Sequence, residues 1–168
     1  MSHPFDLLPT RPVSFERERG VTEVRVQTGM AHVEVRLPGQ DVETERLAVL
    51  QAVAGDGLPV LLIKLHPGAV SFALPDPAVT GRAEALLRAR GYLYAIEPDL
   101  ALLTITAGAM RDLSGVMASL YDAMDTLGIR VAQTGDAHDS LFALVPGAQA
   151  AQGAAALRVA FGLPEDVS

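Results

Sequence analysis

The chain has 168 residues, of which 49% are hydrophobic and 20% are charged, and its formal net charge is −7 at pH 7. These values predict a folded chain with a packed core, and the acidic charge argues against a nucleic-acid partner, which would need a basic face. Because no cysteine is present, disulfides, zinc-finger spacings and thiol nucleophiles are excluded.

The first twenty residues predict an extension without structure of its own. They lack the basic segment and apolar run of a signal peptide, and no apolar stretch of the chain approaches the ~20 residues that cross a bilayer. We therefore expect a cytoplasmic protein with no membrane contact. Residues 21–27 (VTEVRVQ) alternate as a first strand, and residues 28–29 separate them from the next.

A first set of elements follows between residues 31 and 96. Val33, Val35 and Leu37 alternate with charged residues, which predicts a half-buried strand. Asp76 is placed to cap a later helix, and Gly91 to end it. The complete expected order is a strand at 31–37, a helix at 43–54, strands at 60–65 and 70–74, a helix at 76–91, a strand at 92–96 and a break at 97–99.

The remaining residues predict the same order again. Strands are expected at 100–107, 129–134 and 141–145, and helices at 112–127 and 148–161. Four segments in the two sets align at a constant offset of 70 or 71 residues, for example residues 71–75 (SFALP) over 141–145 (LFALV). Such regular self-similarity favours an internal duplication.

Each copy therefore predicts a β-α-β-β-α-β unit, the ferredoxin-like arrangement of an α+β fold, with an antiparallel sheet and both helices on one face. The second copy lacks residues for its last strand, whereas residues 21–27 are a spare strand. Since an open sheet edge is unfavourable, we expect residues 21–27 to complete the second unit. The expected organisation is an extension at 1–20, a first unit at 21–98 and a second at 99–168.

Several motifs of the second copy resemble the tandem ACT domains that form the C-terminal regulatory region of aspartokinases. Residues 100–105 (LALLTI) resemble the family's LAKVSIVG strand, and residues 108–111 (GAMR) its G-x-G-M-R turn. Residues 114–116 (SGV) resemble x-P-G-V, and residues 128–131 (GIRV) resemble G-I-N-I. The kinase domain is not part of this sequence, so the resemblance implies a non-catalytic protein without a cofactor.

The resemblance also implies where a ligand would bind. ACT domains bind small amino acids as allosteric effectors, at the loop between the first strand and first helix and at the second strand. Backbone N–H groups at a helix start suit the ligand's carboxylate. The first copy departs from the family's D-x-P-G, and the family's strand-two Gln falls at Lys64. The implied residues are Gly39, Gln40, Asp41, Val42, Lys64, Met110, Arg111, Asp112, Leu113, Ser114, Gly115, Gln133 and Thr134.

Other chemistry is weaker in the sequence. Asp136, His138 and Asp139 cluster in one turn, but polar turns commonly have this composition and no metal is expected. Ser114 suits a helix cap better than a nucleophile, and Lys64 suits either an acidic ligand, an ion pair with Asp41 or the solvent face of an edge strand.

Three functions remain open at this stage. The first is an effector-binding ACT pair for a small amino acid, lysine or threonine among the options, acting as a homodimer or on an amino-acid biosynthetic enzyme. The second is a ligand-free interaction module that dimerises through its ACT sheets. The third, a small enzyme, is the weakest because no acid–base pair is evident.

Overall fold

The computed structural model describes residues 20–108 and 112–164 of the chain. Within these residues the elements are β1 (Val21–Arg36), α1 (Val42–Gly55), β2 (Leu61–His66), β3 (Ala69–Leu74), α2 (Pro77–Ala89), β4 (Leu93–Ala107), α3 (Leu113–Thr126), β5 (Gln133–Asp136), β6 (Ser140–Pro146), the 3-10 helix η1 (Gly147–Gln149) and α4 (Ala150–Ala160).

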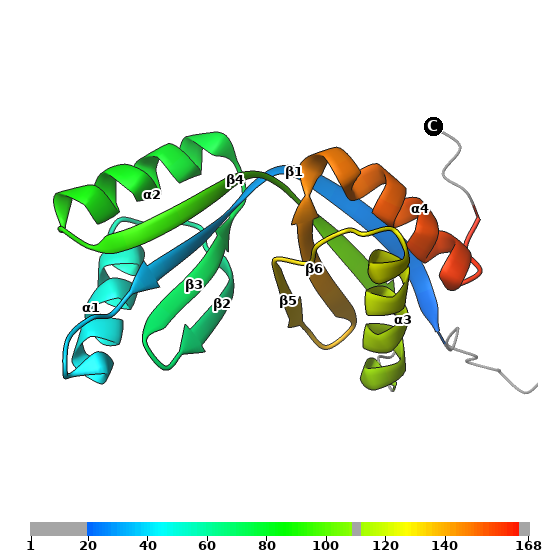
Figure 1. The fold of residues 1–168 in the computed structure, drawn as a ribbon, viewed down its shortest axis with the longest axis horizontal. Helices are drawn as coiled ribbons and strands as arrows, with labels where there is room; N and C mark the ends of the chain where they lie inside the picture. Colours follow the sequence, from blue (N-terminus) through cyan, green and yellow to red (C-terminus); the bar gives the residue numbers. More distant parts are fainter. Residues whose placement is uncertain (1–19, 109–111, 165–168) are drawn as a thin grey trace, which may run out of the picture.

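All six described strands form one antiparallel sheet in the order β2-β3-β1-β4-β6-β5. The long strands β1 and β4 lie side by side at its centre and run through both ends of the molecule (Figure 1). We call one end the first lobe: α1, α2, β2 and β3 with residues 30–36 of β1 and 93–97 of β4. The second lobe holds α3, α4, β5 and β6 with residues 21–27 of β1 and 100–107 of β4.

The strand segments of the two expected units are joined in one continuous sheet, because the lobes share the strands β1 and β4. Residues 28–29 and 97–99 do not interrupt the strands but lie inside β1 and β4. Gly29 and Asp99 have positive φ values of 76° and 58°, and the β1–β4 register shifts between Gln27 and Met30 and between Met30 and His32. These β-bulges bend the strands while their pairing continues on both sides.

The pairing of residues 21–27 follows from this continuity. Val21 lies opposite Ala107, and Gln27 lies opposite Leu102, so the first strand segment of the chain borders the β4 segment of the second lobe. The buried side chain that enters the lobe core is at an even position before Gly29 (Val24) and at an odd position after it (Val33). The bulge therefore changes which positions of β1, even or odd, face the helix-covered core in each lobe.

Two other boundaries differ from the sequence prediction. The strand expected at residues 129–134 is only Gln133–Asp136, because the Ile129 N–H donates to the Met124 carbonyl and completes the end of α3 instead. The helix expected at residues 148–161 begins as the 3-10 turn η1. Gly147 lies against the β4 bulge, where a Cβ would come within 2.7 Å of the Asp99 carbonyl oxygen.

The predicted cap of α2 is confirmed. The Asp76 carboxylate accepts a hydrogen bond from the Val79 N–H at 2.8 Å, and Pro77 occupies the first turn, where a missing N–H costs nothing.

Each lobe has its own apolar core between its sheet segment and its two helices. The first-lobe core includes Val33, Phe72 and Leu87, and the second-lobe core includes Leu103, Leu120 and Leu157. A third cluster lies between the lobes on the sheet face without helices, which we call the helix-free face. Its buried members are Met30, Ala73, Leu100, Leu102 and Leu144.

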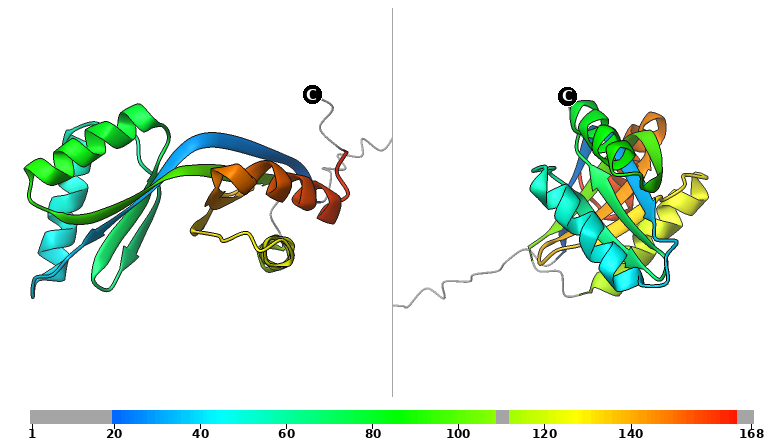
Figure 2. Two further views of the ribbon diagram at one scale, coloured as in Figure 1. Left: turned by 45° about the horizontal axis from the view of Figure 1, so that its top comes forward. Right: turned by 90° about the vertical axis from the view of Figure 1, so that its left-hand side faces the viewer.

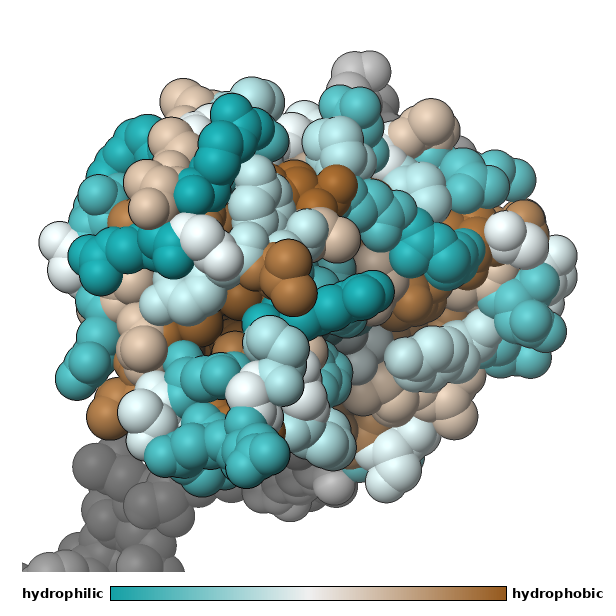
Figure 3. Space-filling view, turned by 60° about the vertical axis from the view of Figure 1, so that its left-hand side comes forward, coloured by the Kyte–Doolittle hydropathy of each residue, from teal (hydrophilic) through white to brown (hydrophobic). Residues whose placement is uncertain are grey.

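The two further views show the lobes at the ends of the shared strands, each with its helix pair (Figure 2). The end of the first lobe is mostly hydrophilic, with hydrophobic side chains visible between the hydrophilic ones (Figure 3). Across the described residues, none of the helices is both long and apolar enough to traverse a bilayer.

Candidate functional site

The loop before α1 contains four of the expected ligand residues, and the chain's own acidic groups bind its polar atoms. Asp41 caps α1: its Oδ1 accepts from the Thr44 N–H at 3.1 Å and its Oδ2 from the Thr44 hydroxyl at 2.7 Å. The Thr44 hydroxyl, followed by the Thr44 N–H, lowers the pKa of Asp41 below its ordinary value. Gln40 and Val42 flank this cap.

Glu45 closes the same loop from the helix. Its Oε2 accepts a hydrogen bond from the Gly39 N–H at 3.2 Å. A Cβ on residue 39 would collide with this carboxylate, so glycine is what lets Glu45 approach the backbone. A carboxylate of the chain therefore already accepts from an N–H group in the loop where the resemblance implies a ligand.

Of the loop before α3, the structure describes the residue that caps the helix. Asp112 caps the helix by accepting from the Gly115 N–H at 3.0 Å. The expectation that Ser114 is the cap is wrong, because α3 already begins at Leu113 and Asp112 is its N-cap. Met110 and Arg111 lie outside the described residues.

Lys64 lies on the edge strand β2, opposite Ser71 of β3, and is half-buried. It is the only lysine of the chain, whose other basic residues are arginines. Among the described residues it has no ion-pair partner, and Asp41 is engaged at its helix cap. A compact ammonium without a partner can bind a ligand carboxylate.

A cavity of about 370 Å³ adjoins Lys64 where β2 approaches β5. Its walls are mainly apolar and come from both lobes. They are formed by Leu61, Leu62, Ile63, Lys64, Leu102, Gly135, Asp136 and Phe142. The volume and the mixture of an apolar lining with a few charged groups are typical of small-molecule sites.

Gln133 and Thr134 of β5 were both expected to contact a ligand, but they lie on opposite faces. Gln133 pairs with Leu144 of the helix-free cluster, whereas Thr134 pairs with Ala143 of the second-lobe core. Only Gln133 shares the helix-free face with Lys64. The Gln133 Oε1 accepts a hydrogen bond from the Ser71 hydroxyl at 2.8 Å.

Three residues of this face were not expected from the sequence. His32 Nε2 lies 2.9 Å from Gln133 Oε1, and His66 Nε2 lies 2.9 Å from the hydroxyl of Ser71. A histidine in an alternating strand is ordinary, and a serine in an apolar strand gives no signal by itself. Only the tertiary arrangement, which brings β5 against β1, β2 and β3, places these side chains together.

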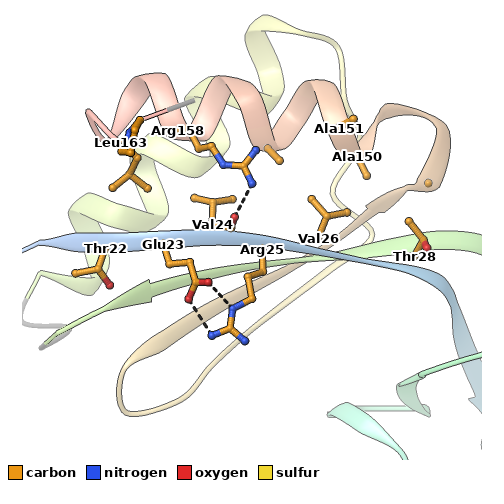
Figure 4. Close-up of a pocket in the computed structure, with 13 residues that line it drawn as sticks. Thr22, Glu23, Val24, Arg25, Val26, Thr28, Ala150, Ala151, Arg158 and Leu163 are labelled. Carbon is orange, nitrogen blue, oxygen red and sulfur yellow. Dashed lines mark hydrogen bonds and ion pairs between the residues drawn. The ribbon is translucent and has the colours of Figure 1, made fainter. Parts of the chain in front are cut away.

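A second hollow of about 630 Å³ lies between α4 and the outer edge of β1 (Figure 4). Val24 and Val26 face the alanines of α4, whereas Glu23 and Arg25 pair with each other on the far side of the strand. The Arg25 hydrogen bond lowers the pKa of Glu23. Arg158 reaches across from α4 and donates to the Val24 carbonyl at 2.8 Å, which covers this strand edge.

Metal ligands do not gather in the part of the chain that the structure describes. No group of three His, Asp or Glu side chains there is placed to hold a metal ion, and this includes the turn of Asp136, His138 and Asp139.

The fold is similar to that of several solved structures. No protein-family model and no curated protein sequence matches the chain. Among solved structures, a chain of the aspartokinase alpha and beta subunits is similar, with a TM-score of 0.74 and 20% identity over 85% of this chain and 99% of that one. The ligand-free regulatory subunit of aspartate kinase from Thermus thermophilus gives 0.72 and 18%, over 84% and 99%.

A longer chain is similar over about a third of its length. Escherichia coli aspartokinase III in complex with lysine and aspartate has a TM-score of 0.60 and 17% identity, over 85% of this chain and 33% of that one. The resemblance to the regulatory region of aspartate kinase, without its kinase domain, is therefore a shared fold that extends over nearly all of the described chain.

Proposed function

We propose that this chain is a non-catalytic regulatory protein of aspartate-family amino-acid metabolism that binds a small amino acid as an allosteric effector. The single observation that carries the proposal is the cavity between β2 and β5, where the only lysine of the chain stands beside an apolar lining. The fold supports it, since a structure of this fold is described in complex with lysine.

In this proposal Lys64 attracts the effector's carboxylate into the cavity between the two strands. The apolar residues Leu61 and Phe142 hold the side chain. The loops at the starts of α1 and α3 are the second place that the family resemblance implies for a ligand, although the carboxylates of Asp41 and Asp112 already accept from helix-start N–H groups there.

A thermal-shift screen with the twenty amino acids tests the function. Because the effector binds only the folded chain, a concentration of ~100 Kd adds ~2.7 kcal/mol to the free energy of unfolding. Lys64→Met should abolish the shift. The matched control Arg36→Met removes an exposed cation from β1 and should leave the shift unchanged. No shift with any amino acid contradicts the proposal.

We further propose that the lobes represent two ferredoxin-like ACT units, residues 21–98 and 99–168, interlocked through β1. Matching positions support this: the helix caps Asp41 and Asp112 are 71 residues apart, and so are the helix ends Asp56 and Leu127. The boundary between the units falls inside β4, so each unit shares the strand β4 with the other.

The alternative function is an interaction module that forms a homodimer through its sheet. The exposed apolar side chains of the edge strand β2 favour it: Leu61, Ile63 and Leu65 are 39%, 46% and 56% exposed. Sedimentation of Leu65→Glu should show loss of dimer. The control Leu47→Glu alters an equally exposed leucine on α1, at 55%, and should still dimerise. If both variants dimerise, or neither does, the β2 edge is not the dimer interface.

A partner enzyme of amino-acid biosynthesis and a cytoplasmic location belong to the same proposal. Co-purification of the chain with such an enzyme, dependent on the effector, would support regulation of that enzyme rather than simple storage of the ligand.

A further inference from the structure

The lobes meet at a second place besides their shared strands: the outer strands β2 and β5 are in contact on the helix-free face (Figure 1). Gln133 of β5 donates from its side-chain Nε2 to the main-chain carbonyl of Leu62 in β2. Gly135 is equally close, since a Cβ there would come within 2.6 Å of Leu62 Cδ2. The contact between β2 and β5 therefore depends on the amide side chain of Gln133 and on the absence of a side chain at Gly135.

The Leu62 carbonyl fixes the orientation of the whole Gln133 amide. A carbonyl only accepts hydrogen bonds, so the NH₂ group of Gln133 must face it. The amide oxygen then faces Ser71 and His32, at 2.8 and 2.9 Å. Because that oxygen is also only an acceptor, the Ser71 hydroxyl and the His32 Nε2–H must both donate to it.

The same constraint extends to His66. Ser71 is 1% exposed, and its only proton points to Gln133, so its oxygen must accept from His66 Nε2–H at 2.9 Å. Both histidines therefore carry a proton on Nε2. This direction also excludes a catalytic pair, because His66 donates to Ser71 and cannot take its proton.

The backbone of β2 is shaped for this bond. The register of β2 against β3 shifts between Leu61 and Lys64, so Leu62 has no partner in the β2–β3 pairing. Leu62 has a φ of 52°, a left-handed conformation that is rare for a leucine. Such residues are held in place by their surroundings, and here the Leu62 carbonyl is held by the other lobe.

Both shared strands bend at matching places between the lobes. Gly29 in β1 and Asp99 in β4 have left-handed φ values, and the register shifts of the β1–β4 pair lie beside them. Hinges are commonly a few residues that absorb a backbone rotation, while the elements on either side move as rigid bodies.

We propose that Gln133 is a latch between the lobes. With the Gln133–Leu62 bond formed, β2 and β5 are held together. With it broken, the lobes pivot about Gly29 and Asp99 and the outer strands separate, while the apolar cluster around Met30 stays packed. The cavity beside Lys64 lies between the same two strands, so a molecule that spreads them opens the latch.

Distance measurement between spin labels tests the latch directly. Because the chain has no cysteine, Gln51→Cys on α1 and Asp122→Cys on α3 would provide the only two label sites, both exposed and in matching positions of the two lobes. The closed protein should give one narrow distance distribution. Adding Gln133→Leu should shift it to longer distances and broaden it.

Two further variants separate the latch from a general loss of stability. Gln133→Glu keeps the size of the side chain and can still accept from Ser71, but it cannot donate to Leu62, so it should open the lobes as Gln133→Leu does. Gln152→Leu makes the same substitution at an exposed site on α4 and should leave the distances unchanged. Unchanged distances in folded Gln133→Leu or Gln133→Glu would overturn the proposal.

Nitrogen NMR of the histidine rings provides a test on the unaltered protein. Spectra of His32→Gln and His66→Gln assign the two signals. Both rings should show a protonated Nε2. A neutral ring with its proton on Nδ1 at either residue would contradict the hydrogen-bond direction on which the latch rests.

Discussion

The starts of α1 and α3 occupy matching places in the two lobes, but their polar groups differ. Thr44 and Glu45 follow the Asp41 cap, and their hydroxyl and carboxylate engage the loop. The corresponding positions after Asp112 hold Gly115 and Val116, which provide no such groups. The two helix starts thus share a capping aspartate, but only the start of α1 also has a hydroxyl and a second carboxylate at the next positions.

The same contrast applies to the outer strands. β2 has six residues with an apolar row and Lys64, whereas β5 has four, of which Gln133 reaches into the other lobe. The first lobe therefore supplies the charge and the second supplies the latch. The two lobes therefore share a fold but contribute different polar groups to the region between β2 and β5.

The largest expected effect tests whether the lobes unfold together. Leu87 of α2 and Leu157 of α4 are buried at matching positions, with 1% and 0% exposure. Leu→Ala at either site should cost about 2–5 kcal/mol, from lost burial and the cavity left behind. Because β1 and β4 run through both cores, each variant should still unfold in one transition in calorimetry. Separate transitions for the lobes would show that they are independent.

The next effect compares the two helix caps. Asp112→Ala should lower the free energy of unfolding by about 1 kcal/mol, the usual value of a lost N-cap, and Asp112→Asn should restore most of it. Asp41→Ala should be more destabilising than Asp112→Ala, because it loses the Thr44 hydroxyl as well as the N–H. Urea titration measures both, and the reverse order would contradict the contrast between the caps.

A local effect follows from the closed loop. Glu45→Val, which introduces the residue type found at position 116, should speed hydrogen exchange of the Gly39 amide, because its acceptor is gone. The melting temperature should change little, since this bond is exposed. The reciprocal Val116→Glu should leave Gly39 unchanged. If the Gly39 amide exchanges equally fast in both variants and in the parent chain, Glu45 does not close the loop.

The smallest effect is one of pH. The folded-state pKa of Asp41 lies below its ordinary value, so its contribution to stability is complete above the unfolded pKa of about 4 and is lost as pH falls through the folded pKa. Asp41→Asn keeps a cap that does not titrate. Acid titrations of unfolding should show a stability advantage of the parent chain that shrinks below about pH 4. A constant difference would contradict the pKa direction.

Local patterns anticipated much of the fold. The alternation around Val33 and the Asp76 cap predicted a strand and a helix start, because each depends on neighbours in sequence. The continuity of β1 through Gly29 could not be predicted, since a glycine that bends a paired strand resembles one that ends it. Pairing with β4 decides the outcome.

The candidate site was predictable to a lesser degree. Lys64 stood out as a charge within an apolar strand, and the structure places it beside a cavity. Gln133 was predicted to contact a ligand, but its amide is bonded to Leu62 and Ser71. Those partners are more than sixty residues away in sequence, so no local pattern points to them.

Carbon-13 reductive methylation gives the most direct test of effector binding at Lys64. Methylation keeps the charge of the amine and labels Lys64, the only lysine, together with the chain's N-terminal amine. During titration with the amino acid that gives the largest thermal shift, the Lys64 methyl signal should move to a saturating value while the N-terminal signal stays fixed. A Lys64 signal that stays unchanged while the protein is stabilised would contradict the account.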